Sequence, residues 1–382
     1  MKICFVTTVY LTLDAFVTAQ AQFIHEKHPE YEIFFICDYN ESFEKSLPDY
    51  IKYIPVSMNR GVDLKGIKTI FALKKIFKKN SFDLIIYATP NASLYSSFAG
   101  RMAGIKKRLY CQWGIRYVGF SGIKRLVFKS LEKITCLNST FINAVSPRNR
   151  QFAIDEGLYK PEKAVIVGNG GTVGVDLNLY DINKYNDFRS EIRNEYSIKN
   201  EFVLGFVGRL SRDKGAFELL SAIKEFSEKN NIKLMIVGAN ELSEKDIPCE
   251  LKIWAENSDR IIFTGSKDKE QVVKHYAAID AYIHPSYREG FGMVLQEAGA
   301  MACPIITTDI PGAGEVFENG KSCLLAKKAD VESLLCCIES LYNDRNLCVE
   351  LGENARRCVE EKYERKHMLV NLVERYEKIL GV

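Results

Sequence analysis

Short apolar runs typical of buried strands alternate with helix-like stretches along the whole chain. A first series of such runs covers residues 2–6, 33–37, 84–87, 109–111, 141–142 and 164–167, and a second covers 202–207, 233–237, 261–263, 281–283 and 304–307. Alternation at this spacing is typical of parallel sheets covered by helices. The sequence therefore predicts an α/β fold with two Rossmann-like, doubly wound parallel-sheet domains facing a cleft.

A polar, charged passage over residues 181–200 separates the two series. We therefore expect an N-terminal domain at 1–182 and a C-terminal domain at 183–362. Residues 363–382 have apolar positions close to helical spacing, which predicts a terminal helix that packs back on the N-terminal domain. Ligands of such sheets bind outside the carboxyl ends of the strands, so functional residues are sought there.

Composition indicates a globular protein of the cytoplasm. Hydrophobic residues make up 47% of the 382 residues, and no window approaches eighteen uninterrupted apolar residues. The apolar run at residues 2–6 turns polar at Thr7, too early for a signal peptide. Eleven cysteines lie scattered without a C-x-x-C pair, as expected of reduced thiols and not of a zinc or disulfide framework. We expect neither a metal nor a cofactor.

Positive charge is concentrated in one part of the chain. The net charge is +3, yet residues 51–150 hold 19 Lys/Arg against three acidic residues. Residues 64–79 and 122–133 read as basic amphipathic helices, which can lie on an anionic membrane at the inner face of the plasma membrane. The alternative is a core-facing helix with a solvated charged face. Nucleic-acid binding is not expected, because interleaved aromatics and a recognised module are absent.

The first strand of the second series leads into a cationic loop. Gly208, Arg209 and Lys214 follow the run at 202–207 and precede a helix-like stretch. A guanidinium fork and an ammonium at a strand end can hold a diphosphate. Solvated loop cations are the alternative. The loop lacks the pattern of a Walker P-loop, and neither domain opens with G-x-G-x-x-G, which weakens ATPase and dehydrogenase readings.

A second loop, at residues 284–297, carries two glutamates with seven residues between them. Gly290 and Gly292 lie between Glu289 and Glu297, after a strand-like run and before a helix-like one. Glycines allow backbone N–H groups to approach a phosphate, and a carboxylate accepts hydrogen bonds from hydroxyls. Plain turn glycines and helix-dipole glutamates are the alternative. Together the loop and its neighbours favour a sugar-nucleotide ligand.

These motifs carry a resemblance to a known family. The segments at 207–215, 263–265, 284–297 and 311–320 resemble the donor half of a GT-B-fold retaining glycosyltransferase of family 4. The resemblance is specific over roughly residues 200–330 and weaker over the whole chain. It implies transfer of a sugar from a nucleotide-diphosphate donor, UDP more than GDP, with retention and without a side-chain nucleophile or a metal. The absence of Asp-x-Asp in the sequence agrees with the last point.

The resemblance also implies roles for individual residues. Arg209, Lys214 and Glu289 would be catalytic, the two cations on the diphosphate and the carboxylate on the sugar hydroxyls. Glu297 would hold the ribose. The remaining donor-binding residues implied are Gly208, Gly265, Ser266, Gly290, Phe291, Gly292 and Met293.

The first domain departs from the family pattern. The loop at residues 7–14 lacks the usual glycine pair, and Gln112 or Trp113 stands where many members have a histidine. Gln112, Arg116 and Asn169 are candidates for the acceptor side or the cleft, with loop and packing roles as the alternative. The acceptor expected is a glycan, including a lipid-linked polysaccharide intermediate. A GT-B-fold sugar-nucleotide epimerase and a non-catalytic sugar-nucleotide-binding subunit remain the rival hypotheses.

Overall fold

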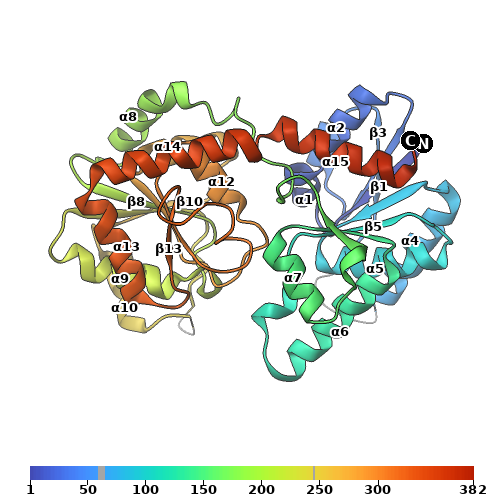
Figure 1. Ribbon diagram of the computed structural model, residues 1–382, viewed down its shortest axis with the longest axis horizontal. Helices are drawn as coiled ribbons and strands as arrows, with labels where there is room; N and C mark the ends of the chain where they lie inside the picture. The colour runs from blue at the N-terminus through green and yellow to red at the C-terminus, as the bar shows by residue number, and fades with distance from the viewer. Residues whose placement is uncertain (59–64, 244–245) are drawn as a thin grey trace. The chain divides into compact units, whose positions relative to one another are not determined.

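The computed structural model describes residues 1–58, 65–243 and 246–382, and it divides into two compact units. Unit 1 holds Met1–Val173 together with Lys366–Val382, and unit 2 holds Gly174–Arg365. The chain passes from unit 1 to unit 2 after Val173, whereas the sequence predicts this boundary after residue 182. Each unit is an α/β structure built on one parallel sheet (Figure 1).

Unit 1 contains a seven-stranded sheet in the order β3-β2-β1-β4-β5-β6-β7, with every described pair parallel. Its strands are β1 (Lys2–Val6), β2 (Glu32–Cys37), β3 (Ile51–Pro55), β4 (Leu84–Tyr87), β5 (Arg108–Gln112), β6 (Phe141–Ala144) and β7 (Ala164–Ile166). Its helices are α1 (Tyr10–Phe16), α2 (Thr18–Lys27), α3 (Glu41–Ser46), α4 (Lys65–Asn80), α5 (Pro90–Met102), η1 (Arg116–Gly119), α6 (Gly122–Asn138), α7 (Pro147–Asp155), η2 (Pro161–Lys163) and α15 (Arg365–Leu380).

Both faces of this sheet are buried because its strand residues alternate between two apolar clusters. Cys4 and Val6 of β1 face a cluster that includes residues of α4, α5, α6 and α7. Ile3 and Phe5 face the opposite cluster, which includes residues of α1, α2, α3 and α15. The terminal helix α15 thus belongs to the core of unit 1, where the Tyr376 hydroxyl donates to Gln20 at 2.6 Å.

Unit 2 contains a six-stranded parallel sheet in the order β10-β9-β8-β11-β12-β13. Its strands are β8 (Phe202–Val207), β9 (Ile232–Val237), β10 (Ile261–Gly265), β11 (Ala281–His284), β12 (Ile305–Thr308) and β13 (Leu324–Ala326). Its helices are η3 (Ile182–Lys184), α8 (Tyr185–Glu195), η4 (Arg212–Lys214), α9 (Ala216–Ser227), α10 (Cys249–Asn257), α11 (Lys269–Ala278), α12 (Met293–Ala300), α13 (Val331–Asn343) and α14 (Arg345–Lys362).

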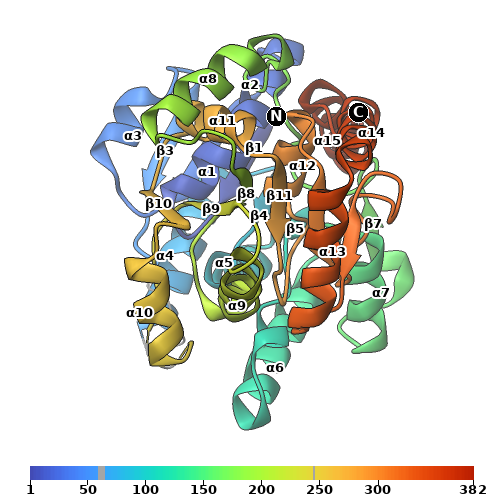
Figure 2. The same ribbon diagram turned by 90° about the vertical axis from the view of Figure 1, so that its left-hand side faces the viewer.

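Helices cover this second sheet in the same layered manner. One face packs on α9, α10, α13 and the start of α14 through a single apolar cluster. On the other face α11 packs against β8 and α8, and these helices lie beside each other in Figure 2. The expectation of two Rossmann-like parallel-sheet domains is confirmed.

Candidate functional site

In each sheet the chain reverses its direction of winding at one point, where a crevice forms outside the carboxyl ends of two neighbouring strands. In unit 2 that point lies between β8 and β11, which pair in parallel although about seventy residues of chain separate them. Gly208, Arg209 and Lys214 follow β8, and residues 285–292 follow β11. The topology therefore brings the cationic loop and the glutamate loop to the same edge of the sheet.

The two loops touch through their backbones. Gly215 has a left-handed φ of +76°, and a Cβ built on it would stand 2.0 Å from the Pro285 carbonyl oxygen. Next to it the Tyr287 N–H donates to the Asp213 carbonyl at 2.9 Å, and Arg288 pairs with the Asp213 carboxylate at 3.0 Å. Glycine is required here because any side chain would push the loops apart.

Lys214, His284 and Glu289 form the centre of the site. Lys214 Nζ makes an ion pair with Glu289 Oε1, and His284 Nε2 lies 2.7 Å from the same oxygen. His284 is 1% exposed and its Nδ1 lies 3.3 Å from the Tyr282 hydroxyl. With Nε2 donating to the carboxylate, Nδ1 is free to accept from that hydroxyl. The sequence pattern predicts no role for His284, although this residue directly follows the strand-like run at 281–283 within the same motif.

The electrostatics of Glu289 follow from these contacts. Burial raises the pKa of Glu289, but the hydrogen bond from His284 and the charge of Lys214 outweigh burial and hold this pKa well below its usual range. Glu289 is thus ionised at neutral pH, with its second oxygen available for hydroxyl donors. The ion pair also keeps a cation at the carboxyl end of β8.

Arg209 is placed differently from Lys214. Its guanidinium pairs with Glu241 at 2.6 Å, and both side chains are about half exposed. An exposed ion pair of this kind contributes about 0–1 kcal/mol to stability. The Arg209 guanidinium can therefore leave Glu241 and bind a diphosphate with little loss of free energy.

The glycine loop between the two glutamates ends at the start of α12. Gly292 precedes the helix with φ +59° and, as a glycine, has no side chain with which to cap the first turn. Phe291 is 4% exposed and packs edge-on against Tyr363, so its ring belongs to the core and only its backbone can face a ligand. Met293 is the first residue of α12.

Glu297 lies one turn further along α12. The Tyr276 hydroxyl donates to it at 3.2 Å, and Tyr180 also hydrogen bonds with it. Burial raises the pKa of Glu297, and the two tyrosines offset only part of this rise. Hydroxyl donors from a ligand would stabilise this buried carboxylate further.

Gly265 and Ser266 stand at the end of β10, two strands from β8. Gly265 has φ +72° and its carbonyl accepts from the Gly238 N–H at 2.9 Å. Ser266 is exposed. The structure therefore places every donor-side residue predicted from sequence at the carboxyl edge of one sheet.

The three candidates in unit 1 have different surroundings. Gln112 is 2% exposed, and both ends of its amide are engaged: it donates to Glu132 at 2.7 Å and accepts from Tyr159 at 2.8 Å. Gln112 therefore links Glu132 and Tyr159 in a buried hydrogen-bond network. Arg116 lines a cavity, and Asn169 is an exposed loop residue.

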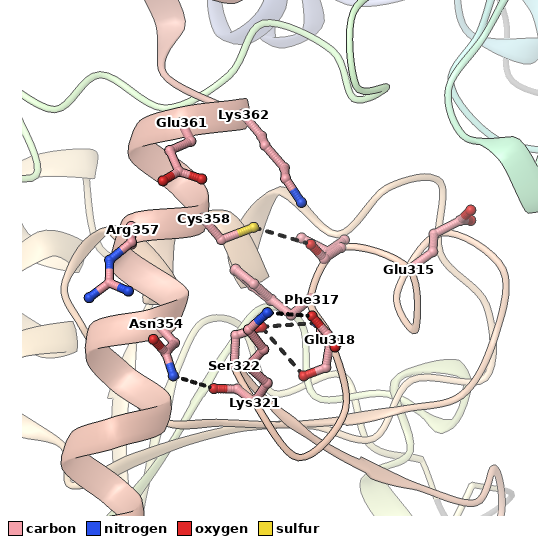
Figure 3. Close-up of a pocket in the computed structure, with 11 residues that line it drawn as sticks. Glu315, Phe317, Glu318, Lys321, Ser322, Asn354, Arg357, Cys358, Glu361 and Lys362 are labelled. Atoms are coloured by element: carbon pink, nitrogen blue, oxygen red, sulfur yellow. Dashed lines mark hydrogen bonds and ion pairs between the residues drawn. The ribbon is translucent and has the colours of Figure 1, made fainter.

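A separate pocket of unit 2, of about 520 Å³, lies between the loop at 315–322 and α14 (Figure 3). Two of its charged side chains pair, Lys321 with Glu318 at 3.1 Å, and the Asn354 amide donates to the Lys321 carbonyl at 2.8 Å. None of the donor-side residues named above is among the described residues that line it. The pocket is distinct from the candidate site.

Over residues 1–58, 65–243 and 246–382, no group of three or more His, Cys, Asp or Glu side chains has the arrangement of a metal site. In the same ranges no helix is long and apolar enough to cross a bilayer.

Comparison with known proteins supplies the family. The model of the group 1 glycosyl transferases matches residues 188–358, and a glycosyl transferase 4-like model matches residues 2–146. The capsular polysaccharide biosynthesis glycosyltransferase CapM of Staphylococcus aureus is 28% identical over 94% of this chain and 93% of its own. The UDP-Gal:alpha-D-GlcNAc-diphosphoundecaprenol alpha-1,3-galactosyltransferase of Escherichia coli is 25% identical over 92% and 88%.

Solved structures share the fold at lower identity. HepE of Anabaena, crystallised in complex with UDP, superposes with a TM-score of 0.78 at 20% identity over 99% of this chain and 100% of that chain. WaaG, a glycosyltransferase involved in lipopolysaccharide biosynthesis, gives a TM-score of 0.72 at 16% identity over 100% of both chains. With motifs, topology and family models in agreement, the chain belongs to the group 1 glycosyltransferases and has the GT-B fold.

Proposed function

We propose that the chain is a retaining, metal-independent glycosyltransferase that moves a sugar from a UDP-sugar to a glycan acceptor in polysaccharide synthesis. The observation that carries the proposal is the cluster of Lys214, His284 and ionised Glu289 at the carboxyl edge of unit 2. The names of the relatives and of the UDP complexes support a transferase that uses UDP more than GDP. These findings do not favour an epimerase or a non-catalytic binding subunit.

The proposed reaction needs no protein nucleophile. The bond from the sugar C1 to the diphosphate oxygen breaks, a bond from C1 to the acceptor oxygen forms on the same face, and the acceptor proton passes to the departing diphosphate. Arg209 and Lys214 stabilise the charge that develops on the diphosphate. Glu289 accepts hydrogen bonds from sugar hydroxyls, and Glu297 from the ribose. Positioning of this kind can remove roughly 7–11 kcal/mol of barrier.

A thermal-shift panel of nucleotides and nucleotide sugars tests the donor side of the proposal. UDP at about 100 times its dissociation constant should stabilise the fold by about 2.7 kcal/mol and raise the melting temperature by several degrees. GDP should give a smaller shift, and Arg209→Ala should reduce the shift with UDP, because the arginine fork is lost. The absence of any shift with uridine or guanosine diphosphates would refute the proposal.

We also propose that unit 1 docks on an anionic membrane, at the inner face of the plasma membrane, and that the acceptor is lipid-linked. A set of exposed apolar side chains, here named the α6 patch, consists of Val118, Ile123, Leu126 and Val127. Ile123 is 81% exposed and Leu126 is 61% exposed. Side chains of this size gain about 1.5–3 kcal/mol each on full burial, which makes the patch unfavourable in water.

Basic residues accompany the patch. Lys124 and Lys133 of α6 have no acidic partner in the described part of the chain, and the exposed face of α4 carries Lys68, Lys75, Lys78 and Lys79. Each such cation contributes about 1 kcal/mol near an anionic leaflet. α5 packs against both α4 and α6, so the two basic helices belong to one layer of unit 1. All eleven cysteines are free thiols, in keeping with a cytoplasmic location.

Liposome sedimentation tests the docking proposal. Wild-type protein should sediment with vesicles that contain anionic lipid and much less with neutral vesicles. Serine at Ile123, Leu126 and Val127 together should abolish the binding. Leu137→Ser, which removes an equally exposed apolar side chain at the other end of α6, should not. Equal, negligible binding of the wild type to both kinds of vesicle would contradict docking.

A further inference from the structure

Unit 1 has a winding reversal of its own, between β1 and β4. A cavity of about 330 Å³ lies at this point, outside the carboxyl ends of the two strands. Its lining consists of Thr8, Val9, Thr12, Thr89, Pro90, Asn91 and Arg116. Three hydroxyls, one amide and one guanidinium thus surround a space large enough for a small polar group, at the place where ligands of doubly wound sheets bind.

The hydroxyl groups of this cavity offer unused hydrogen-bond donors. Thr8 is 7% exposed, and its hydroxyl lies 2.8 Å from that of Thr89, which also accepts from the Thr8 N–H at 3.0 Å. Two hydroxyls that share one hydrogen bond leave one O–H proton without an acceptor. The Thr12 hydroxyl likewise has no partner among the described residues. The cavity wall therefore presents two O–H donors.

Arg116 adds a fixed positive charge. Its guanidinium lies 4.8 Å from the centre of the Phe128 ring, which holds the side chain in place from one side. Within the described residues it forms no ion pair, whereas the nearby Arg125 is bound to Glu156 at 3.0 Å. No carboxylate is present among the described residues that line the cavity. The positive charge of Arg116 is thus available to a ligand.

The first turn of α5 supplies a further positive potential. The helix has thirteen residues and begins at Pro90 on the wall of the cavity, and the side chain of Thr89 does not cap it. The positive end of the helix dipole therefore faces the same space as Arg116 and the hydroxyls. A guanidinium fork, hydroxyl donors and a helix end together match a tetrahedral oxyanion better than a neutral sugar.

We propose that this cavity binds a phosphate group of the acceptor, so that the acceptor substrate is a phosphate or diphosphate ester of a glycan. The identity of the acceptor in this inference rests on the proposed function. Binding of an anion by the cavity is independent of the proposed function. Thr8, Thr12 and Arg116 are then substrate-binding residues, and the two threonines lie in the loop at residues 7–14, where the sequence lacks the glycine pair of the family. The donor diphosphate is bound separately, by Arg209 and Lys214 of unit 2.

Direct binding tests the anion site. Inorganic pyrophosphate is titrated calorimetrically into the full-length protein with the donor site saturated by UDP. Arg116→Ala should weaken pyrophosphate binding at least tenfold and Thr12→Val several-fold, while UDP affinity stays within twofold. Lys106→Ala is the matched control, because this exposed cation precedes β5 at the opposite edge of the sheet. Equal pyrophosphate binding by the wild type and both cavity variants, or none by the wild type, would overturn the site.

Kinetics separate an acceptor phosphate from a free anion. With a water-soluble alkyl diphosphate glycan as acceptor, Arg116→Ala should raise the acceptor KM tenfold or more and leave the donor KM unchanged, and Arg116→Lys should restore part of the loss. An unchanged acceptor KM combined with lost pyrophosphate binding would overturn the acceptor assignment and indicate a site for free phosphate. If the wild type fails to bind UDP, the proposed function fails instead, and pyrophosphate titration of Arg209→Ala protein still tests the cavity.

Discussion

Replacing Lys214 with alanine is expected to lower kcat by about 10²–10³-fold, the usual effect of removing one preorganised group that stabilises developing charge. The Lys214 side chain is 22% exposed and its ammonium is already held by Glu289, so it needs no reorganisation when a diphosphate departs. The variant should remain folded, because Glu289 keeps its hydrogen bond from His284. Single-turnover transfer from the donor selected in the thermal-shift panel measures the effect.

Lys274→Ala is the matched control for this experiment. Lys274 is 23% exposed in the same unit and pairs with Glu191 at 2.6 Å, so its removal deletes a comparable ion pair away from the carboxyl edge. It should leave kcat within about twofold, as for a surface pair worth about 0–1 kcal/mol. Equal kcat values for the two variants would mean that Lys214 only holds Glu289 and does not act on the diphosphate.

The position of the proposed donor-side residues at the carboxyl ends of the strands could be predicted from the sequence, because each residue follows its strand along the chain. Arg209 and Lys214 come after β8, and Glu289 comes after β11, in the order of successive βα units. The sequence did not reveal that Lys214 and Glu289 form an ion pair. That contact depends on β8 and β11 being neighbours, and the alternation of strands and helices does not reveal the order of the strands in the sheet.

The strands that the sequence analysis did not predict lie at the edges of the sheets. β3 contains Lys52 and ends at Pro55, and its residues are mostly half exposed, so it lacks the continuous apolar run of a central strand. β13 has only three residues. Edge strands are buried on fewer sides, and their composition accordingly carries a weaker signal.

The sequence also did not reveal the direction in which individual side chains point. Gln112 ends a predicted strand, as site residues do, yet the structure turns it into a buried network with Glu132 and Tyr159. Thr8 and Thr89 gave no signal because threonines are common in loops, and only the pairing of β1 with β4 brings them together. Residues that act through contacts between distant loops are therefore the ones that need a structure.

The contact between the two loops of the candidate site leads to a large expected effect on stability. Gly215→Ala should destabilise the protein by more than about 3 kcal/mol, because it combines two costs. A left-handed φ costs an alanine roughly 1–2 kcal/mol. In addition its Cβ would stand 2.0 Å from the Pro285 carbonyl oxygen, and this backbone atom cannot move without separating the β8 and β11 loops.

Gly320→Ala isolates the first of these costs. Gly320 has nearly the same φ, +74°, but no atom lies within 4 Å of the position its Cβ would take. Urea unfolding of this variant should therefore show a loss of only about 1–2 kcal/mol. The difference between the two variants measures how tightly the loops are held together, and Gly215→Ala should also weaken UDP binding, since Lys214 is its neighbour. Equal destabilisation by the two substitutions would show that the loops separate freely and that the site is not preorganised.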